Sequence, residues 1–530
     1  MLDTIKCRLQ KNKFEIGLVA IILAVYLPGI FTKFMYIDDC AYFFKHMTHQ
    51  MFTNVYTADL NVILANGRPL AALYQILMFG WINHVWEAQV GRVFGVVSTV
   101  VLSFLILKFM KSKNFDNFAS FLFAGLVVIL PCFIVWNEWL TCNIYIFGCI
   151  LSYFAAYSLD LCNLENNEES ELSIIIRNAK YVLMSTVLVY FAYLIYQPSA
   201  SFFIVFAVIE LVSYTMNNYN KVYISTKLVM FLVSFYLASV LEFATQRILL
   251  NIFKPQNILE RSELALSIIN AVKRLCVNII YPSLQLFYVQ TCKLNIISNI
   301  IAAIVGLIIL VFLFNLFYKI YKEHDVMFLF TTVMLFCILI ISSSIGTFVI
   351  SSNIGGYRII GPVEAIILFL LIVSLQKYRK ISIAILCIAI FLSAINLNYK
   401  FIDVAHYEYT QVNKVINEQL HSKKEIKGIK VYAYNMNNYI KKANSNQEFN
   451  FGSLSFGPGN ASARKFLILA IICSMDNSLG KELYYHFDDY QISYSHFVII
   501  NSPHYIIVNT VPIVNKQFHK TPTRILINIL

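Results

Sequence analysis

Residues 14–44 read FEIGLVAIILAVYLPGIFTKFMYIDDCAYFF, an apolar run that ends at two adjacent aspartates, Asp38 and Asp39. About 20 apolar residues are enough for a helix to cross the hydrocarbon core of a bilayer. Basic residues precede the run and no small-residue cleavage site follows it, which predicts a signal anchor that is retained. The acidic pair therefore lies just beyond the first predicted span, where a charge is costly and often has a function.

The composition of the whole chain predicts a polytopic α-helical membrane protein. Of its 530 residues, 58% are hydrophobic and only 13% are charged, whereas soluble domains carry about 25% charged residues. The net charge of +12 is explained by Lys and Arg at the ends of membrane spans. No basic helix with interleaved aromatic residues is present, so we expect no nucleic-acid partner.

About 11 apolar runs are long enough to span a bilayer. They cover residues 14–35, 90–110, 117–136, 143–162, 180–196, 199–216, 228–248, 297–318, 326–346, 359–376 and 381–398. The run 69–86 is interrupted by polar residues, and we predict that it lies in the interface. Without it as a span, all the basic clusters between spans face the cytoplasm, as the positive-inside rule requires. The N-terminus is then cytoplasmic and the C-terminus lies outside.

This topology divides the chain into two parts. Residues 1–398 form a membrane module, whose outer loop 36–89 contains the interfacial helix 69–86. Residues 399–530 form a small extracytoplasmic α/β domain, with expected strands at 429–434 and within 496–508 and a buried helix at 463–475. The predicted location is the bacterial inner membrane, crossed many times, with the C-terminal domain in the periplasm.

The acidic pair is a candidate general base, because a carboxylate at a membrane cavity can take a proton from an attacking hydroxyl group. Alternatively, both aspartates are solvated acids that cap the next helix.

His46 and His49 are three residues apart near the acidic pair, and they form either a metal site or a polar helix face.

Two arginines follow tight turns on the same predicted outer side. Arg68 lies between a glycine and a proline that can open a helix, and Arg358 follows Gly355-Gly356. Arginine binds phosphate through two parallel hydrogen bonds, so both are candidate phosphate ligands. Alternatively, each is an interface anchor that extends towards water.

Glu138 lies between Trp136 and Trp139, a pattern that suggests stacking on a sugar, although an aromatic belt at the membrane interface has the same composition. We predict that the following residues bind substrate: Asn66, Glu138, Trp139, Tyr196, Gln197 and Tyr357.

An acidic pair after the first span, the run Asn-Gly-Arg-Pro-Leu at 66–70 and Tyr-Gln-Pro-Ser at 196–199 together form a pattern. Over residues 10–400, this pattern resembles the membrane O-antigen glucosyltransferases of serotype-converting phages, the Gtr family, which has a GT-C-like architecture. The resemblance implies that a sugar, usually glucose, moves from a polyprenyl-phosphate carrier to a surface polysaccharide. It assigns Asp38 or Asp39 as the base, and Arg68 and Arg358 as ligands of the donor phosphate.

The same resemblance implies a lipid-linked donor, a polysaccharide acceptor such as lipopolysaccharide, and functional partners that synthesise and flip the donor. It implies no nucleotide sugar, and we assume no metal ion or other cofactor. Two alternatives remain: a polymerase of lipid-linked polysaccharide, and a transporter or flippase of a lipid-linked sugar. A transporter would carry ionisable residues near the midplane of several spans. In this sequence, the main ionisable residues within the predicted spans are Glu210, Glu242 and Glu364.

Overall fold

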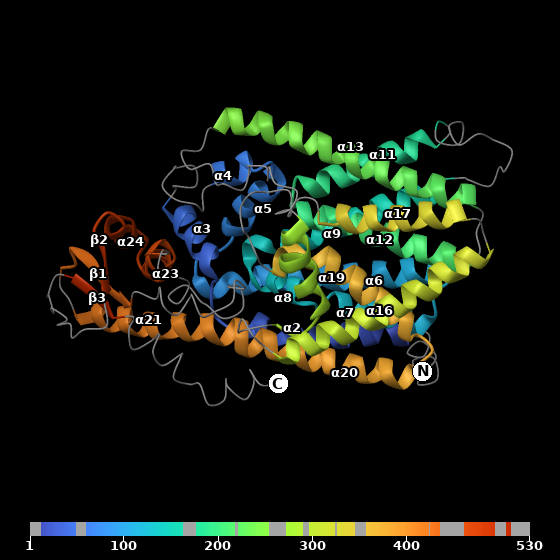
Figure 1. Ribbon diagram of the computed structural model, residues 1–530. Coiled ribbons are helices and arrows are strands. Elements are labelled where there is room, and N and C mark those ends of the chain that lie inside the picture. The colour runs from blue at the N-terminus through green and yellow to red at the C-terminus, as the bar shows by residue number, and fades with distance from the viewer. Residues whose placement is uncertain are drawn as a thin grey trace, which may run out of the picture.

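The computed structural model describes residues 12–48, 60–162, 176, 178–217, 221–253, 272–289, 296–323, 326–344, 357–422, 425–434, 461–492 and 505–509. Long helices lie side by side in one bundle, and a small parallel sheet lies beyond one end of it (Figure 1). The candidate site lies at that same end, so the arrangement of the helix ends is what matters for function.

Eight helical stretches of the described residues are long and apolar enough to cross a membrane. They are Lys13–Phe31 (α2), Val85–Ser112 (η1 and α6, Ala88–Ser112), Leu140–Asp160 (η2 and α9, Ile144–Asp160), Gln197–Met216 (α12), Ile224–Phe253 in α13 (Lys221–Phe253), Ile296–Lys322 in α16 (Ile296–Glu323), Tyr357–Leu375 (α19) and Arg379–Ser422 (α20, Arg379–Ile395; η5, Asn396–Ile402; α21, Asp403–Ser422). The chain is therefore mostly helical, as predicted.

The remaining three predicted spans also coincide with helices. α7 (Asn117–Val127) and α8 (Pro131–Glu138) form a pair bent by 51°, which counts as a ninth span if the chain crosses there once. Pro131 opens α8 and has no N–H to continue the preceding helix, which explains the break. α11 (Ala179–Tyr193) and α17 (Val326–Ser342) are shorter than the length test requires. The total of about 11 crossings therefore stays a prediction.

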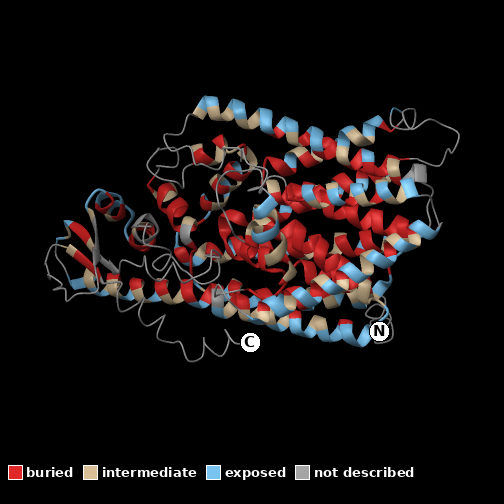
Figure 2. Cartoon of the chain, viewed as in Figure 1, coloured by how far each residue is buried: buried red, intermediate tan, exposed pale blue. Residues whose placement is uncertain are grey.

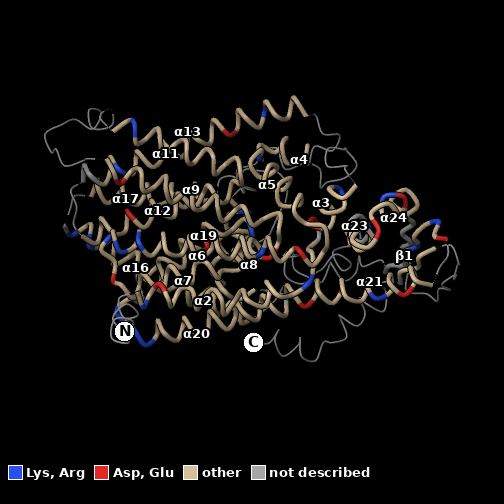
Figure 3. The backbone as a smooth tube through the Cα atoms, turned by 180° about the vertical axis from the view of Figure 1, so that it is seen from behind, with Lys and Arg blue, Asp and Glu red and all other residues tan. Residues whose placement is uncertain are grey.

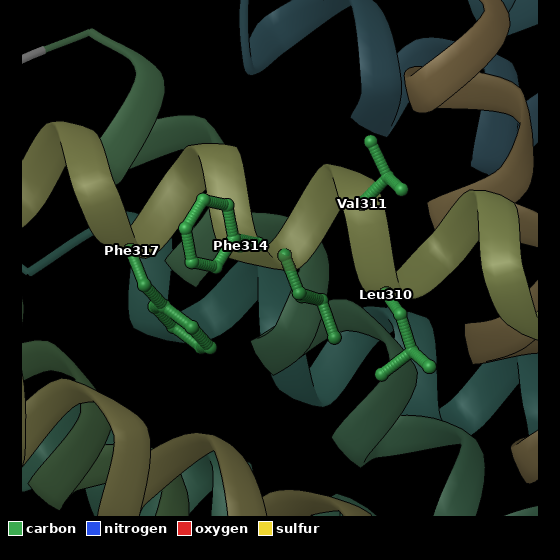
Figure 4. A pocket seen from close by; sticks show the side chains of 5 residues that line it. Leu310, Val311, Phe314 and Phe317 are labelled. Carbon is green, nitrogen blue, oxygen red and sulfur yellow. The ribbon is translucent and has the colours of Figure 1, made fainter.

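Burial separates the central helices from the peripheral ones (Figure 2). Nearly every residue of α12 is buried, whereas α16 exposes a row of apolar side chains that includes Leu307 and Phe314. A shallow pocket on this exposed face is lined by Leu310, Val311, Leu313, Phe314 and Phe317 (Figure 4). A continuous exposed apolar face such as that of α16 suits a lipid environment.

Lys and Arg residues gather at the end of the bundle where α2 begins, and we call it the basic end (Figure 3). Its helix ends are joined by Lys111–Glu15 at 3.7 Å, Lys113–Asp160 at 2.7 Å, Lys227–Asp160 at 3.2 Å and a 2.9 Å bond from Lys319 Nζ to the Met216 carbonyl. These contacts gather lysines that the sequence assigned to the cytoplasmic side. Which side of a membrane the basic end faces stays a prediction.

The opposite end, which we call the site end, holds the helices of the predicted outer loop. They are α3 (Ile37–Met47), α4 (Leu60–Ala65) and α5 (Pro69–Phe79). The predicted helix 69–86 is too long: α5 ends at Phe79, and a new helical turn begins at Val85. The Glu87 carboxylate accepts hydrogen bonds from the backbone N–H groups of Asn83 and His84, at 2.6 and 3.2 Å, and so starts that turn.

The C-terminal residues form a parallel sheet of order β2-β1-β3 with helices beside it. The strands are β1 (Gly428–Tyr434), β2 (Phe487–Ile492) and β3 (Tyr505–Asn509), and the helices are α23 (Ala461–Cys473) and α24 (Asn477–Leu483). β1 and α23 match the predicted strand 429–434 and helix 463–475. Of the predicted strand region 496–508, only 505–508 lies within the described residues. The predicted boundary at 398/399 falls inside a continuous helical stretch, from α20 through η5 into α21.

The acid-bearing helix α3 packs into the core of this C-terminal unit. Phe44 stacks on Tyr484 with ring centroids 5.3 Å apart and lies 5.7 Å from the ring of Phe466. Both partners belong to one buried apolar cluster that also contains Ile429 of β1 and Ile506 of β3. The C-terminal unit therefore helps to hold the helix that begins with Asp38 and Asp39.

Candidate functional site

Asp39 is buried at the third position of α3, and backbone N–H groups hold its carboxylate. The Oδ2 atom accepts hydrogen bonds from Tyr36 N at 3.3 Å and Leu140 N at 3.1 Å, and Oδ1 accepts one from Thr141 N at 3.1 Å. Asp39 thus caps α3, as the alternative predicted, and fastens it to the turn before α9, but it is buried and not solvated as that alternative also required. Burial raises the pKa of this carboxyl to about 7, although these N–H groups and Arg92 oppose the rise.

Asp38 differs from its neighbour because its side chain is only half-buried. The two aspartates are adjacent on a helix, so their side chains point in directions about 100° apart, given 3.6 residues per turn. The structure therefore separates the pair into a buried carboxylate and a more accessible one.

Arg92, a fully buried residue of α6, joins the two segments that lead into the acidic pair and Trp139. Its guanidinium donates hydrogen bonds to the Thr32 carbonyl at 3.0 Å and the Phe34 carbonyl at 2.6 Å, and its Nε lies 3.3 Å from Glu138 Oε2. Breaking this buried ion pair would leave an uncompensated charge, which is strongly destabilising. Arg92 therefore holds these two segments at fixed positions.

The structure gives Glu138 a place beneath the site instead of the predicted sugar platform. Its side chain is fully buried against Arg92, so in this conformation the carboxylate is not presented to a ligand. Trp139, the next residue, stays in the site: its ring lies edge-on to Tyr36 at 5.0 Å. The guanidinium carbon of Arg358 lies 4.7 Å from the Trp139 ring centroid.

Arg68 has a comparable arrangement on the other side of the site. Gly67 has a φ of +76°, a left-handed conformation that glycine adopts readily, and Pro69 then opens α5. The Arg68 guanidinium carbon lies 4.8 Å from the centroid of Tyr196, and its Nε donates a 3.0 Å hydrogen bond to Gln197 Oε1. Arg68 is half-buried, and it forms no ion pair with any residue that the structure describes.

Tyr145 brings the two arginines into one site. Its ring stacks on Tyr196 with centroids 3.9 Å apart, which places Arg68 against the same aromatic pair. Both Arg68 and Arg358 are close enough to interact electrostatically with the Tyr145 hydroxyl group. The predicted phosphate ligands, which are 290 positions apart in the sequence, therefore lie at the same end of the bundle, Arg68 against Tyr196 and Arg358 against Trp139.

The remaining predicted residues occupy the edges of this arrangement. Tyr357 is buried beside Arg358 at the start of α19, and Asn66 is half-buried in the turn between α4 and α5. His46 is half-buried near the end of α3, while His49 lies outside the described residues. Among the residues that are described, no group of three or more His, Cys, Asp or Glu side chains is arranged to hold a metal ion.

Three residues of the site have no role predicted from the sequence: Arg92, Tyr145 and Glu242. Arg92 had a usable signal, because an ionisable residue inside an apolar span is unusual and marks a site to explain. Glu242 carried the same signal without a partner, and the structure supplies one: Gln197 Nε2 donates to Glu242 Oε1 at 3.0 Å. Tyr145 had no signal in the sequence, because it is one of 33 tyrosines.

Comparison with known proteins gives a limited result. No protein-family model and no curated protein matches the chain. Among solved structures, it is similar to the oligosaccharyltransferase AglB of Archaeoglobus fulgidus. The apo form is 11% identical with a TM-score of 0.42, over 79% of this chain and 62% of that one.

Two further structures from the same organism match this chain with similar identity and coverage. The complex with an inhibitory peptide and a dolichol-phosphate is 11% identical over 84% of this chain and 64% of that one. The form tethered to an acceptor peptide is 12% identical over 83% and 63%. Both have a TM-score of 0.42, and the chain spans less than two thirds of these proteins.

Proposed function

We propose that this chain is an integral-membrane glycosyltransferase that uses a polyprenyl-phosphate-linked sugar as donor. The observation that carries the proposal is that Arg68 and Arg358, each stacked on an aromatic ring, lie at the same end of the bundle as the acidic pair. Arginine side chains suit a phosphate group, which accepts paired hydrogen bonds from guanidinium.

The proposed reaction is a single displacement at the anomeric carbon of the donor sugar. A carboxylate takes the proton from an acceptor hydroxyl group while its oxygen attacks the anomeric carbon. The bond from that carbon to the phosphate oxygen breaks, and its electron pair leaves with the lipid phosphate. Arg68 and Arg358 stabilise the charge that develops there. One displacement inverts the configuration, so product linkage analysis that finds retention would rule this mechanism out.

We assign the proton transfer to Asp38 and a positioning role to Asp39. Asp39 is fully buried, and three backbone N–H groups occupy its two oxygens, which leaves little room for a substrate proton. Asp38 is half-buried on the same helical turn. This assignment chooses between the two aspartates that the resemblance left open.

The resemblance to O-antigen glucosyltransferases supplies the finer part of the proposal. The sugar is then glucose or a similar hexose, and the acceptor is a surface polysaccharide such as lipopolysaccharide O-antigen. The site end faces the periplasm of the bacterial inner membrane, with the C-terminal unit beside it. A donor synthase and a flippase supply the lipid-linked sugar, and no metal ion or nucleotide sugar takes part.

The test compares Asp38→Asn and Asp39→Asn with wild type at matched expression, scoring glucose on the surface polysaccharide. We expect Asp38→Asn to abolish modification, and Asp39→Asn to reduce it together with thermal stability. Asp116→Asn is the matched control, because Asp116 caps α7 from outside the site. Full modification by Asp38→Asn and Asp39→Asn would overturn the acid-pair mechanism. A shortened polysaccharide with normal side-branch glucose would identify a polymerase instead.

A further inference from the structure

Gln197 lies between a cation and a carboxylate that do not touch each other. Its Oε1 atom accepts a 3.0 Å hydrogen bond from Arg68 Nε, and its Nε2 atom donates a 3.0 Å hydrogen bond to Glu242 Oε1. Glu242 is on α13 and only 8% exposed. A neutral amide thus separates opposite charges that could otherwise pair directly.

Arg68 and Glu242 together fix which way the amide faces. An amide has one acceptor oxygen and one donor NH₂ group, and a guanidinium N–H can only donate. The carbonyl oxygen of Gln197 must therefore point to Arg68, and its NH₂ group faces Glu242 Oε1. The reverse orientation would set the NH₂ group against the Arg68 N–H and an oxygen against the carboxylate.

Gly67 permits the close approach of this turn to α13. A Cβ atom at position 67 would lie 3.0 Å from Glu242 Oε1 and 3.0 Å from Gln246 Cβ, and the φ of +76° is unfavourable for other residues. The backbone beside Arg68 therefore packs closely against Glu242, and only glycine at position 67 leaves room for this packing.

We propose that Glu242 is a positioning residue that orients the Arg68 guanidinium through Gln197 without neutralising it. The hydrogen bond at Nε and the Tyr196 ring fix the plane of the guanidinium. Its two terminal nitrogens bond to no residue that the structure describes, and they can bind the phosphate of the donor. A carboxylate in direct contact would instead form an ion pair and compete with that phosphate. This inference rests on the proposed function, since it concerns the same phosphate.

The test measures binding of undecaprenyl phosphate to the full-length protein in detergent micelles, with undecaprenol as the phosphate-free probe. Gln197→Glu brings a carboxylate directly to Arg68, and we expect phosphate binding to weaken about tenfold or more, as charged hydrogen bonds predict. Glu242→Gln removes the carboxylate that anchors the NH₂ group of the amide, and we expect a loss of about threefold to tenfold on the same basis. Undecaprenol binding should be unchanged in both variants, which shows that the fold is intact.

The decisive variant exchanges the two groups, as Gln197→Glu with Glu242→Gln. It keeps the composition, the net charge and the number of hydrogen bonds of the wild type, with the bond between the two positions now donated from position 242, but it places the carboxylate against Arg68. We expect it to bind phosphate as weakly as Gln197→Glu alone. Gln246→Glu, which adds a carboxylate one helical turn away, is the charge control and should have a smaller effect.

The outcomes separate the two proposals. If wild type binds undecaprenyl phosphate no better than undecaprenol, the proposed function fails. If wild type prefers the phosphate but Gln197→Glu or the exchanged variant binds it as wild type does, the role of Gln197 and Glu242 is wrong while the proposed function stands.

Discussion

The lysines at the basic end and Arg68 at the site end are held in opposite ways. At the basic end, Lys113 lies 2.7 Å from Asp160 and 2.8 Å from Glu210, and Lys227 lies 3.2 Å from Asp160. We call these four residues the buried quartet, and their charges cancel. At the site end, Arg68 touches an aromatic ring and a neutral amide. Cancelled charges stabilise the bundle, whereas a cation held by uncharged groups keeps its charge for a ligand.

Breaking the buried quartet should give the largest effect, and it should be an effect on stability. Lys227→Met leaves the carboxylates of Asp160 and Glu210 with one lysine, and we expect a loss of about 3–5 kcal/mol, as for other broken buried pairs. Unfolding in detergent measures it. Turnover per folded molecule should stay close to wild type, and a selective loss of turnover would contradict the division between the two ends.

Removing the charge of Arg68 should affect catalysis and leave stability nearly unchanged. We expect Arg68→Gln to reduce the transfer rate about 100-fold, the usual loss when a donor to a developing negative charge is removed. Arg68→Lys keeps the charge but not the paired hydrogen bonds, so its rate should fall between the two. If Arg68→Gln destabilises the protein as much as Lys227→Met, the arginine is a structural residue.

The pH dependence of stability tests the buried carboxyl at the site end. The pKa of Asp39 is raised from 3.8 to about 7, so the folded state holds a proton that the unfolded state releases. Its contribution to stability is complete below about pH 4 and is lost as the pH rises to about 7. The unfolding midpoint of wild type should therefore fall relative to Asp39→Asn across that range. Parallel curves would show that Asp39 does not titrate there.

The smallest effect should come from an exposed ion pair, which calibrates the buried ones. Lys414 and Glu418 lie 4.0 Å apart on the surface of α21, with most of each side chain in solvent. We expect Glu418→Gln to cost at most about 0.5 kcal/mol and to leave transfer unchanged. A loss comparable to that of Lys227→Met would remove the distinction between cancelled and exposed charges.

The sequence predicted the helices well because spanning helices need long apolar runs, which can be read directly. All the predicted runs coincide with helices, and the run 69–86 proved to be a short helix that ends at Phe79. The site was predictable only in part. Arg68 and Arg358 stood out as cations on the predicted outer side, but the tyrosine they share is set by packing between distant helices.

The burial of Glu138 and Asp39 could not be predicted for the same reason. A carboxylate beside two tryptophans has the same local sequence whether it faces a sugar or pairs with Arg92 across the bundle. Likewise, the partners of Asp39 at residues 140 and 141 are about 100 positions away in the sequence. Side-chain roles at this site depend on contacts between segments, which local patterns do not contain.

The central claim is tested most directly by transfer from a defined donor in proteoliposomes. Purified protein would receive undecaprenyl-phosphate glucose with a labelled sugar, and lipopolysaccharide as acceptor. We expect label to enter the polysaccharide and undecaprenyl phosphate to be released in equal amount. Arg68→Gln combined with Arg358→Gln should abolish both. Equal transfer by wild type and the double variant would contradict the claim that these two arginines bind the donor phosphate.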